Sequence, residues 1–160
     1  MVSAAVSVNL VLYGLIAPFA AALMDRFGIR RVVCVGLLLI AAGAGLSVLA
    51  TTAWHLILTW GLLIGAGTGS MAMVFAATVA NAWFVKRRGL VMGVLTAGGA
   101  AGQLVFLPLV AYLVEVTDWK VASLIVAAAA LAVLPLAVVL LRDRPGDVGL
   151  PPYGGEAVIP

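Results

Sequence analysis

The sequence has few charged residues: its 160 residues contain nine Lys or Arg and six Asp or Glu. Charged residues make up 9% of the chain, whereas hydrophobic residues make up 65%. A water-soluble domain carries about 25% charged residues, because polar side chains have to cover its apolar core. The scarcity of charge therefore excludes an ordinary soluble fold and indicates a protein whose solvent is lipid.

Cysteine and histidine are equally scarce, with one of each, Cys34 and His55. A single cysteine excludes an internal disulfide. Ser70 lies about 22 Å from His55 along one helix, which is too far for a serine–histidine pair. No group of Cys, His and acidic residues has the spacing of metal ligands. We therefore expect no enzyme activity, no bound metal and no cofactor.

Long uncharged apolar runs are abundant instead. About 20 apolar residues cross the hydrocarbon core of a bilayer as an α-helix. The runs are continuously apolar, whereas transmembrane strands alternate. We predict an all-α, polytopic membrane helix bundle in residues 1–141, followed by a Pro/Gly-rich cytoplasmic tail, residues 142–160. The predicted transmembrane helices cover residues 3–24, 32–50, 56–85, 90–114 and 121–141.

The basic residues divide among the connections between these helices. Eight of the nine fall on one face of the membrane, and only Lys120 falls on the other. Because cytoplasmic loops carry an excess of Lys and Arg, we predict a multi-pass protein of the plasma or inner membrane with a cytoplasmic C-terminus. Its expected surroundings are the lipid bilayer. Basic residues split among loops do not form a nucleic-acid-binding surface, so no such partner is expected.

The predicted spans contain polar side chains but no acid or base. Because intramembrane charges mark ion pathways, a cation that holds an anionic substrate is expected elsewhere. The polar residues are candidates for lining a substrate cavity, although hydrogen bonds between helices are the commoner use of such residues. The candidates are Asn9, Tyr13, Thr78, Asn81, Thr96 and Gln103.

Small residues also recur four apart, a spacing that favours close approach of helix backbones. We interpret these pairs as packing faces, with sliding of helices during a conformational cycle as the functional alternative. The pairs are Gly61 with Gly65, Gly89 with Gly93, and Gly98 with Gly102.

The connection at residues 25–31 gathers an acid and three arginines within seven residues. Asp25 ends the first predicted helix, where the helix dipole disfavours an acid. Arg30 and Arg31 begin the next helix, where the dipole disfavours cations. Gly28 allows a sharp turn. We therefore expect Asp25 to have a positive partner, either an arginine or the N-terminus of another helix; the alternative is a plain positive-inside loop.

Residues 25–31 resemble the signature loop between helices 2 and 3 of the major facilitator superfamily. The matching residues are Asp25, Arg26, Gly28, Arg30 and Arg31. Residues 83–99 are similar to the signature loop of the monocarboxylate porters in that superfamily. The matching residues there include Phe84, Lys86, Arg87, Arg88, Gly93 and Gly98. Residues 142–150 resemble the start of the central loop in oxalate/formate-antiporter-like members.

These resemblances imply that the five spans correspond to helices 2 to 6 of one six-helix half, and that the first loop is a conformational switch. They imply an N-terminal-half fragment of a transporter, whose partners are helix 1, the second half (helices 7–12) and a small-molecule substrate. The expected function is movement of a small organic anion, such as a monocarboxylate, by alternating access in symport or antiport. The alternatives are a carrier of another cargo (a drug, sugar or inorganic anion) and a non-transporting membrane packing subunit.

Overall fold

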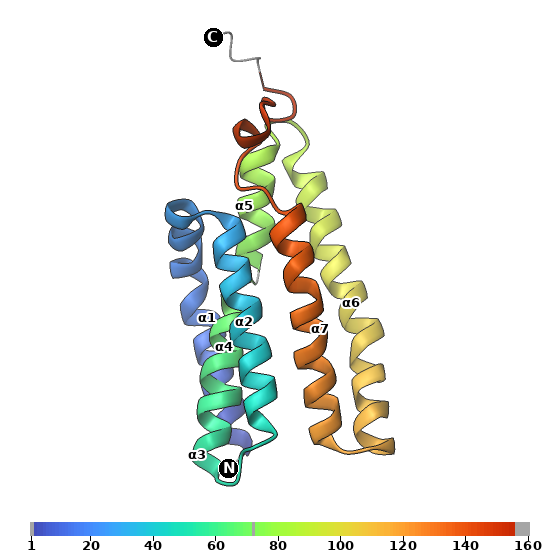
Figure 1. Ribbon diagram of the computed structural model, residues 1–160. Helices are drawn as coiled ribbons and strands as arrows, with labels where there is room; N and C mark the ends of the chain where they lie inside the picture. The colour runs from blue at the N-terminus through green and yellow to red at the C-terminus, as the bar shows by residue number, and fades with distance from the viewer. Residues whose placement is uncertain (1, 72, 156–160) are drawn as a thin grey trace.

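The computed structural model describes residues 2–71 and 73–155 and forms a bundle of long helices (Figure 1). Five helices are long and apolar enough to cross a membrane. This confirms the predicted fold class, an α-helical membrane protein. The five candidate spans are Ser3–Phe27, Ile29–Ser47, Ala53–Trp83, Arg88–Val116 and Trp119–Leu140.

Four of the spans are single helices, in which an apolar run satisfies its own backbone hydrogen bonds. They are α1 (Val2–Phe27), α2 (Ile29–Ser47), α6 (Arg88–Val116) and α7 (Trp119–Leu140). The α1–α2 turn, the α5–α6 turn and the C-terminal tail lie at one end of the bundle, and the α2–α3 and α6–α7 turns lie at the other (Figure 1).

The third span, residues 53–83, is divided into four helical segments. It contains α3 (Ala53–Leu56), the π-helix η1 (Ile57–Ile64), α4 (Gly65–Ser70) and α5 (Met73–Trp83). Met71, with φ −110° and ψ 5°, ends α4. Helix α5 is therefore not a continuation of α4, and its direction can differ from that of α4. Figure 1 shows α5 at the end of the bundle that holds the tail.

One face of α2 forms the centre of the buried core. Its buried residues recur four apart, so they lie in one row along the helix. They are Ile29, Val33, Leu37 and Ala41. This row packs against small side chains of α7, Ala130 and Ala137, which allow the two helices to approach closely.

Glycines bring the third span against α1 without intervening side chains. Gly61, Gly65 and Gly69 are four apart and buried. A Cβ added to Gly65 would lie 3.2 Å from the Cα of Asn9, and one added to Gly69 would lie 3.1 Å from the Cα of Tyr13. The pair Gly61 and Gly65 therefore makes the close helix contact that its spacing predicts.

Asn9 also makes a polar contact with the π-helix, because its Nδ2 donates a hydrogen bond of 3.0 Å to the carbonyl oxygen of Trp60. A hydrogen bond between membrane helices contributes about 0.6–2 kcal/mol. We expect Asn9→Leu, which has similar volume but no donor, to destabilise the 160-residue chain by about 1 kcal/mol. Equilibrium unfolding in mixed detergent–SDS micelles measures this difference.

The matched control is Ser7→Ala on the same helix. The Ser7 hydroxyl donates to the carbonyl oxygen of Ser3 in its own turn, at 2.9 Å, so its loss breaks no contact between helices. We expect this variant to unfold with the wild-type midpoint. Equal losses in the two variants would show that the Asn9–Trp60 bond does not hold α1 to the third span.

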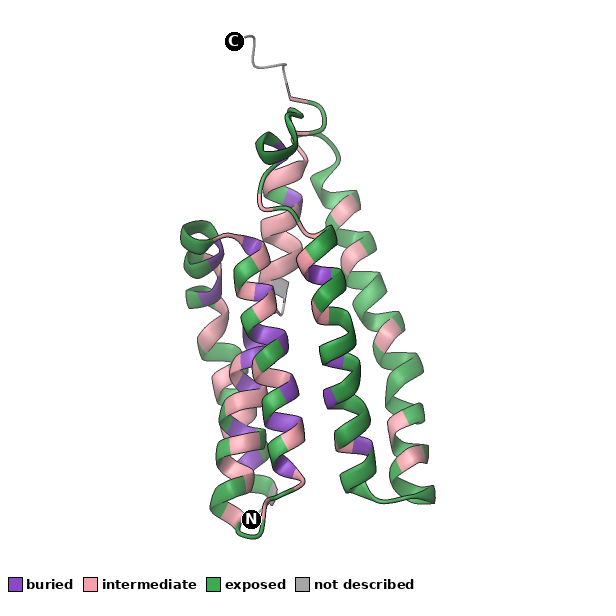
Figure 2. Ribbon diagram, in the orientation of Figure 1, coloured by how far each residue is buried: buried purple, intermediate pink, exposed green. Residues whose placement is uncertain are grey.

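Helix α6 stands apart from the core. No residue of α6 is buried, and its main contacts are with α5 and α7. Figure 2 shows it as an almost entirely exposed or half-exposed helix at the edge of the bundle, whereas buried residues gather along α2 and its neighbours. The glycines of α6, including Gly93 and Gly98, have nothing within 4 Å of an added Cβ. The packing predicted for these glycines therefore has no partner within the described residues.

Candidate functional site

The first signature loop is a one-residue turn between α1 and α2. Gly28 has φ +93°, a conformation that L side chains rarely adopt, and it is the residue that the sequence places there. Met24 and Ile29, on either side, are 2% and 3% exposed, so both ends of the turn are anchored in the core. Asp25, with Arg26 and Arg31, is exposed to solvent. The loop thus has a fixed backbone and a charged outer surface.

A carboxylate occupies the N-terminus of α2, but it belongs to Asp143. Its Oδ1 accepts a 2.8 Å hydrogen bond from the backbone N–H of Arg30. A helix N-terminus carries partial positive charge, so the carboxylate stabilises it. A Cβ on Gly28 would lie 2.6 Å from the Cγ of Asp143, which leaves room for glycine alone.

The sequence interpretation missed this role of Asp143 and considered a docked helix N-terminus only as a partner for Asp25. One signal for an external cap was present. Gly28, the N-cap residue of α2, has no side chain that could accept a hydrogen bond from the first turn. The acceptor then has to come from elsewhere in the chain, and the sequence does not show which of several acids supplies it.

The second signature loop joins α5 to α6. Arg87 has left-handed φ and ψ of 62° and 25° at the N-cap of α6, and the Nε of Arg88 donates to the carbonyl oxygen of Phe84 at 2.5 Å. Lys86, Arg87 and Arg88 are exposed. Gly93 and Gly98 lie further along α6, on its open surface. The basic part of this loop therefore faces solvent at the same end as the first loop (Figure 1).

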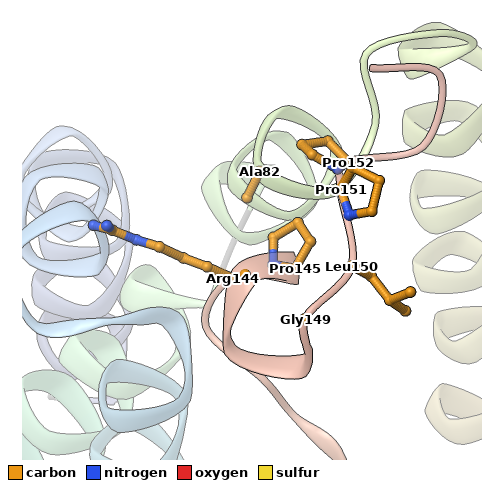
Figure 3. Close-up of a pocket in the computed structure, with 8 residues that line it drawn as sticks. Ala82, Arg144, Pro145, Gly149, Leu150, Pro151 and Pro152 are labelled. Atoms are coloured by element: carbon orange, nitrogen blue, oxygen red, sulfur yellow. The ribbon is translucent and has the colours of Figure 1, made fainter. Parts of the chain in front are cut away.

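The tail contacts both loops. We name its described part, residues 142–155, the strap. Beneath it lies an open groove of about 750 Å³, lined by Ala82 of α5 and by strap residues that include three prolines. In Figure 3 the side chain of Arg144 extends away from these prolines, toward the side of α1 and α2.

The polar candidates for a cavity wall are divided between two regions. On α1, Asn9 is bonded to the third span, and the backbone of Tyr13 packs against it. On α5, the hydroxyl of Thr78 donates to the carbonyl oxygen of Val74, at 2.8 Å, and Asn81 is exposed.

On α6, Thr96 and Gln103 are exposed, and Gln103 borders two shallow grooves of about 670 and 510 Å³. The structure thus brings Asn9 and Tyr13 together against the third span, and it places Thr96 and Gln103 apart from them on the open surface of α6.

Charge is distributed unevenly between the two ends of the bundle. Eight of the nine Lys and Arg residues lie at the end that holds the two signature loops and the strap. At the other end, Lys120 lies with its Nζ 5.9 Å from the ring centroid of Trp119. No group of three or more possible metal ligands occurs among residues 2–71 and 73–155. The basic end thus concentrates cations beside the N-termini of α2 and α6.

Comparison with known proteins assigns the chain to a family. A profile of the Major Facilitator Superfamily matches residues 1–158. Monocarboxylate transporter 11 of Homo sapiens is 35% identical over 146 residues, which cover 89% of this chain and 30% of that protein. Monocarboxylate transporter 13 of Bos taurus is 37% identical over 117 residues, which cover 72% of this chain and 27% of that protein. An MFS-type transporter of Gibberella zeae is 33% identical over 100 residues, 62% of this chain and 22% of that protein. The chain thus spans less than a third of the length of each of these relatives.

Proposed function

The chain belongs to the major facilitator superfamily, and from this premise we propose that it is part of a secondary active transporter for a small organic anion such as a monocarboxylate. The observation that carries the proposal is the similarity to monocarboxylate transporters, one of which aligns with 89% of the chain. The resemblance of residues 83–99 to the monocarboxylate-porter loop agrees with it. Because the chain spans less than a third of its relatives, the activity is proposed for a longer protein.

In this proposal the chain forms one wall of the transport pathway. Transporters of this type bind substrate near the middle of the membrane between two halves that rock around it. The exposed polar side chains of Tyr13, Asn81, Thr96 and Gln103 are the proposed contribution to that wall. All four are uncharged, so the cation that holds a carboxylate would come from the second half.

We assign the basic end of the bundle to the cytoplasm of the cell, because cytoplasmic loops carry an excess of Lys and Arg. This orientation places the strap and both signature loops inside the cell and the α2–α3 and α6–α7 turns outside. The open surface of α6 is where further helices of the longer protein would pack. A helix preceding α1 and a second half of six helices are the proposed partners.

Uptake by proteoliposomes tests the proposal. We expect the full-length protein that contains this chain to take up a radiolabelled monocarboxylate with saturable kinetics, and other carboxylates to compete. The 160-residue chain, reconstituted in the same way, should take up none above protein-free liposomes. Saturable uptake of a sugar or a cationic drug that carboxylates do not inhibit would instead support a different cargo.

The first signature loop offers a second test through Asp25. This residue is exposed beside the turn, so its carboxylate is available to a helix of the second half when the halves close. A hydrogen bond to a charged group contributes about 1.5 kcal/mol, which corresponds to a factor of about ten. We therefore expect Asp25→Asn in the full-length protein to lower the turnover rate about tenfold and to change KM little.

The matched control is Glu115→Gln, which removes an exposed acid near the opposite end of the bundle. Initial uptake rates over a range of substrate concentrations separate turnover from KM. A wild-type turnover rate in Asp25→Asn would remove this residue from the conformational cycle.

A further inference from the structure

We propose that the strap, residues 142–155, is a releasable latch that ties the two signature loops together at the basic end of the bundle. The tail was expected from its Pro/Gly content to act as the start of a linker. The strap instead contacts the α1–α2 turn with its first residues and the α5–α6 turn with its last. The contacts of the strap are independent of the proposed function, whereas their consequence for transport rests on it.

The first attachment is the carboxylate of Asp143 at the N-terminus of α2. Its hydrogen bond to the N–H of Arg30 supplies a cap that α2 lacks in its own sequence. Gly28 faces the same carboxylate, and a Cβ there would overlap all three of its terminal atoms, at 2.6 to 2.7 Å. This attachment therefore needs both an acceptor at position 143 and glycine at position 28.

The second attachment is a backbone pairing at Tyr153. Its N–H donates to the carbonyl oxygen of Trp83 at 2.8 Å, and its carbonyl oxygen accepts from the N–H of Val85 at 2.9 Å. The rings of Tyr153 and Phe84 lie with their centroids 6.0 Å apart. Gly154, with φ +80°, passes so close to Lys86 that an added Cβ would lie 2.7 Å from its Cγ.

Between the two attachments the strap holds its own shape. Residues Pro145–Val148 form a short 3-10 helix, η2. Asp147 caps it by accepting the N–H of Arg144 at 3.0 Å, and the N–H of Leu150 donates to the carbonyl oxygen of Pro145 at 3.1 Å. A segment with this internal bonding transmits a displacement from one end to the other, which a flexible linker would absorb.

The strap contacts the turn that follows α5, a helix that is not continuous with α4. The break at Met71 separates α5 from α4, and Ala80 is the one buried residue between positions 74 and 83. Half-buried side chains of α5, among them Phe75 and Val79, pack against the core. Helix α6 and the α5–α6 turn have no buried residue, and the strap links this turn to the well-buried N-terminus of α2.

The latch is releasable because directional polar contacts hold it, with little apolar burial. Pro145 is the only buried residue of the described strap, and Leu150 is 61% exposed above the open groove (Figure 3). Release of the strap would free the α5–α6 turn without exposing a core. In the transporter of the proposed function, this would allow the two signature loops to move apart during the cycle.

The test asks whether breaking the first attachment loosens the second. Cysteines replace Phe84 and Tyr153 in the full-length protein in its native membrane, after Cys34→Ala removes the native thiol. The rate of their cross-linking by a short thiol-specific reagent reports the second attachment. We expect Asp143→Ala to lower this rate at least fivefold, and the exposed-residue control Arg142→Ala to leave it unchanged.

Gly28→Ala provides the steric arm of the same test. It should lower the cross-linking rate as Asp143→Ala does, and the double variant should be no slower than either single one, because both changes break one attachment. An unchanged rate in Asp143→Ala overturns the latch. If the double variant lowers the cross-linking rate by the product of the two single effects, Gly28 and Asp143 do not act through one attachment, and that part of the proposal is overturned. Cross-linking is measured without substrate, so its outcome is independent of whether the protein carries carboxylates.

Discussion

Replacing Gly67 with alanine is expected to destabilise the folded bundle by about 2–3 kcal/mol, because the helix interface at this position has no room for a methyl group. A Cβ on Gly67 would lie 2.7 Å from the carbonyl oxygen of Gly36 and 2.7 Å from the Cγ1 of Ile40. The carbonyl belongs to the backbone of α2, the helix at the centre of the core. Relief of the overlap therefore requires α2 and α4 to move apart.

The control for this prediction is Gly98→Ala on α6, where no atom of residues 2–71 or 73–155 lies within 4 Å of the added methyl group. Alanine is better than glycine in a helix by about 1 kcal/mol, so this variant should be as stable as wild type or more stable. Unfolding of the 160-residue chain in mixed detergent–SDS micelles compares the two. Equal midpoints would contradict the tight α2–α4 contact.

The glycine pairs predicted from the sequence show how far such patterns reach. The spacing of small residues predicts close helix packing equally for Gly61 with Gly65 and for Gly98 with Gly102. In the structure the first pair is buried against α1, whereas no atom of the described residues lies within 4 Å of a Cβ added to Gly98 or Gly102. The spacing of small residues along one helix shows that the helix has a face without large side chains. Which helix packs on that face depends on the arrangement of the whole bundle.

The apolar runs predicted the all-α membrane fold, because the need to satisfy every backbone group in lipid leaves few alternatives. They did not predict the division of the third span. Residues 57–64 form a π-helix, and α4 ends at Ser70, within a run that hydropathy alone describes as uniform. The π-helix also accepts the Asn9–Trp60 hydrogen bond, between residues 51 positions apart in the sequence, and such a long-range contact is not visible in local hydropathy.

At the basic end, the sequence identified two loops by local signatures but not the segment that joins them. The helix dipole indicated that the turn at residues 25–31 needs compensation. The structure places Asp143 at the N-terminus of α2, 113 positions after Arg30. The Pro/Gly-rich composition of the tail predicts a linker. It does not show the few long-range hydrogen bonds that fix the tail to the two loops, because these depend on the folded arrangement.

The surface of α6 leads to the second large prediction. Its apolar side chains are strongly exposed, for example Leu104 at 78% and Phe106 at 63%, and Gly98 and Gly102, four apart, form a small open face among them. A glycine surface gives no particular advantage in contact with lipid, whereas it allows the backbone of a neighbouring helix to approach closely. If α6 meets other helices of the longer protein, a large side chain on that face separates them.

We therefore expect Gly98→Leu to reduce transport by the full-length protein to background, while the 160-residue chain with the same change unfolds at the wild-type midpoint. The contrast arises because no atom of the described chain lies within 4 Å of a Cβ at position 98, whereas the leucine would block a helix supplied from outside it. Val94→Leu, also on exposed α6, adds little volume and should transport normally. Wild-type transport by Gly98→Leu would mean that this face of α6 meets lipid, and that any further helices of a longer protein pack on another part of the bundle.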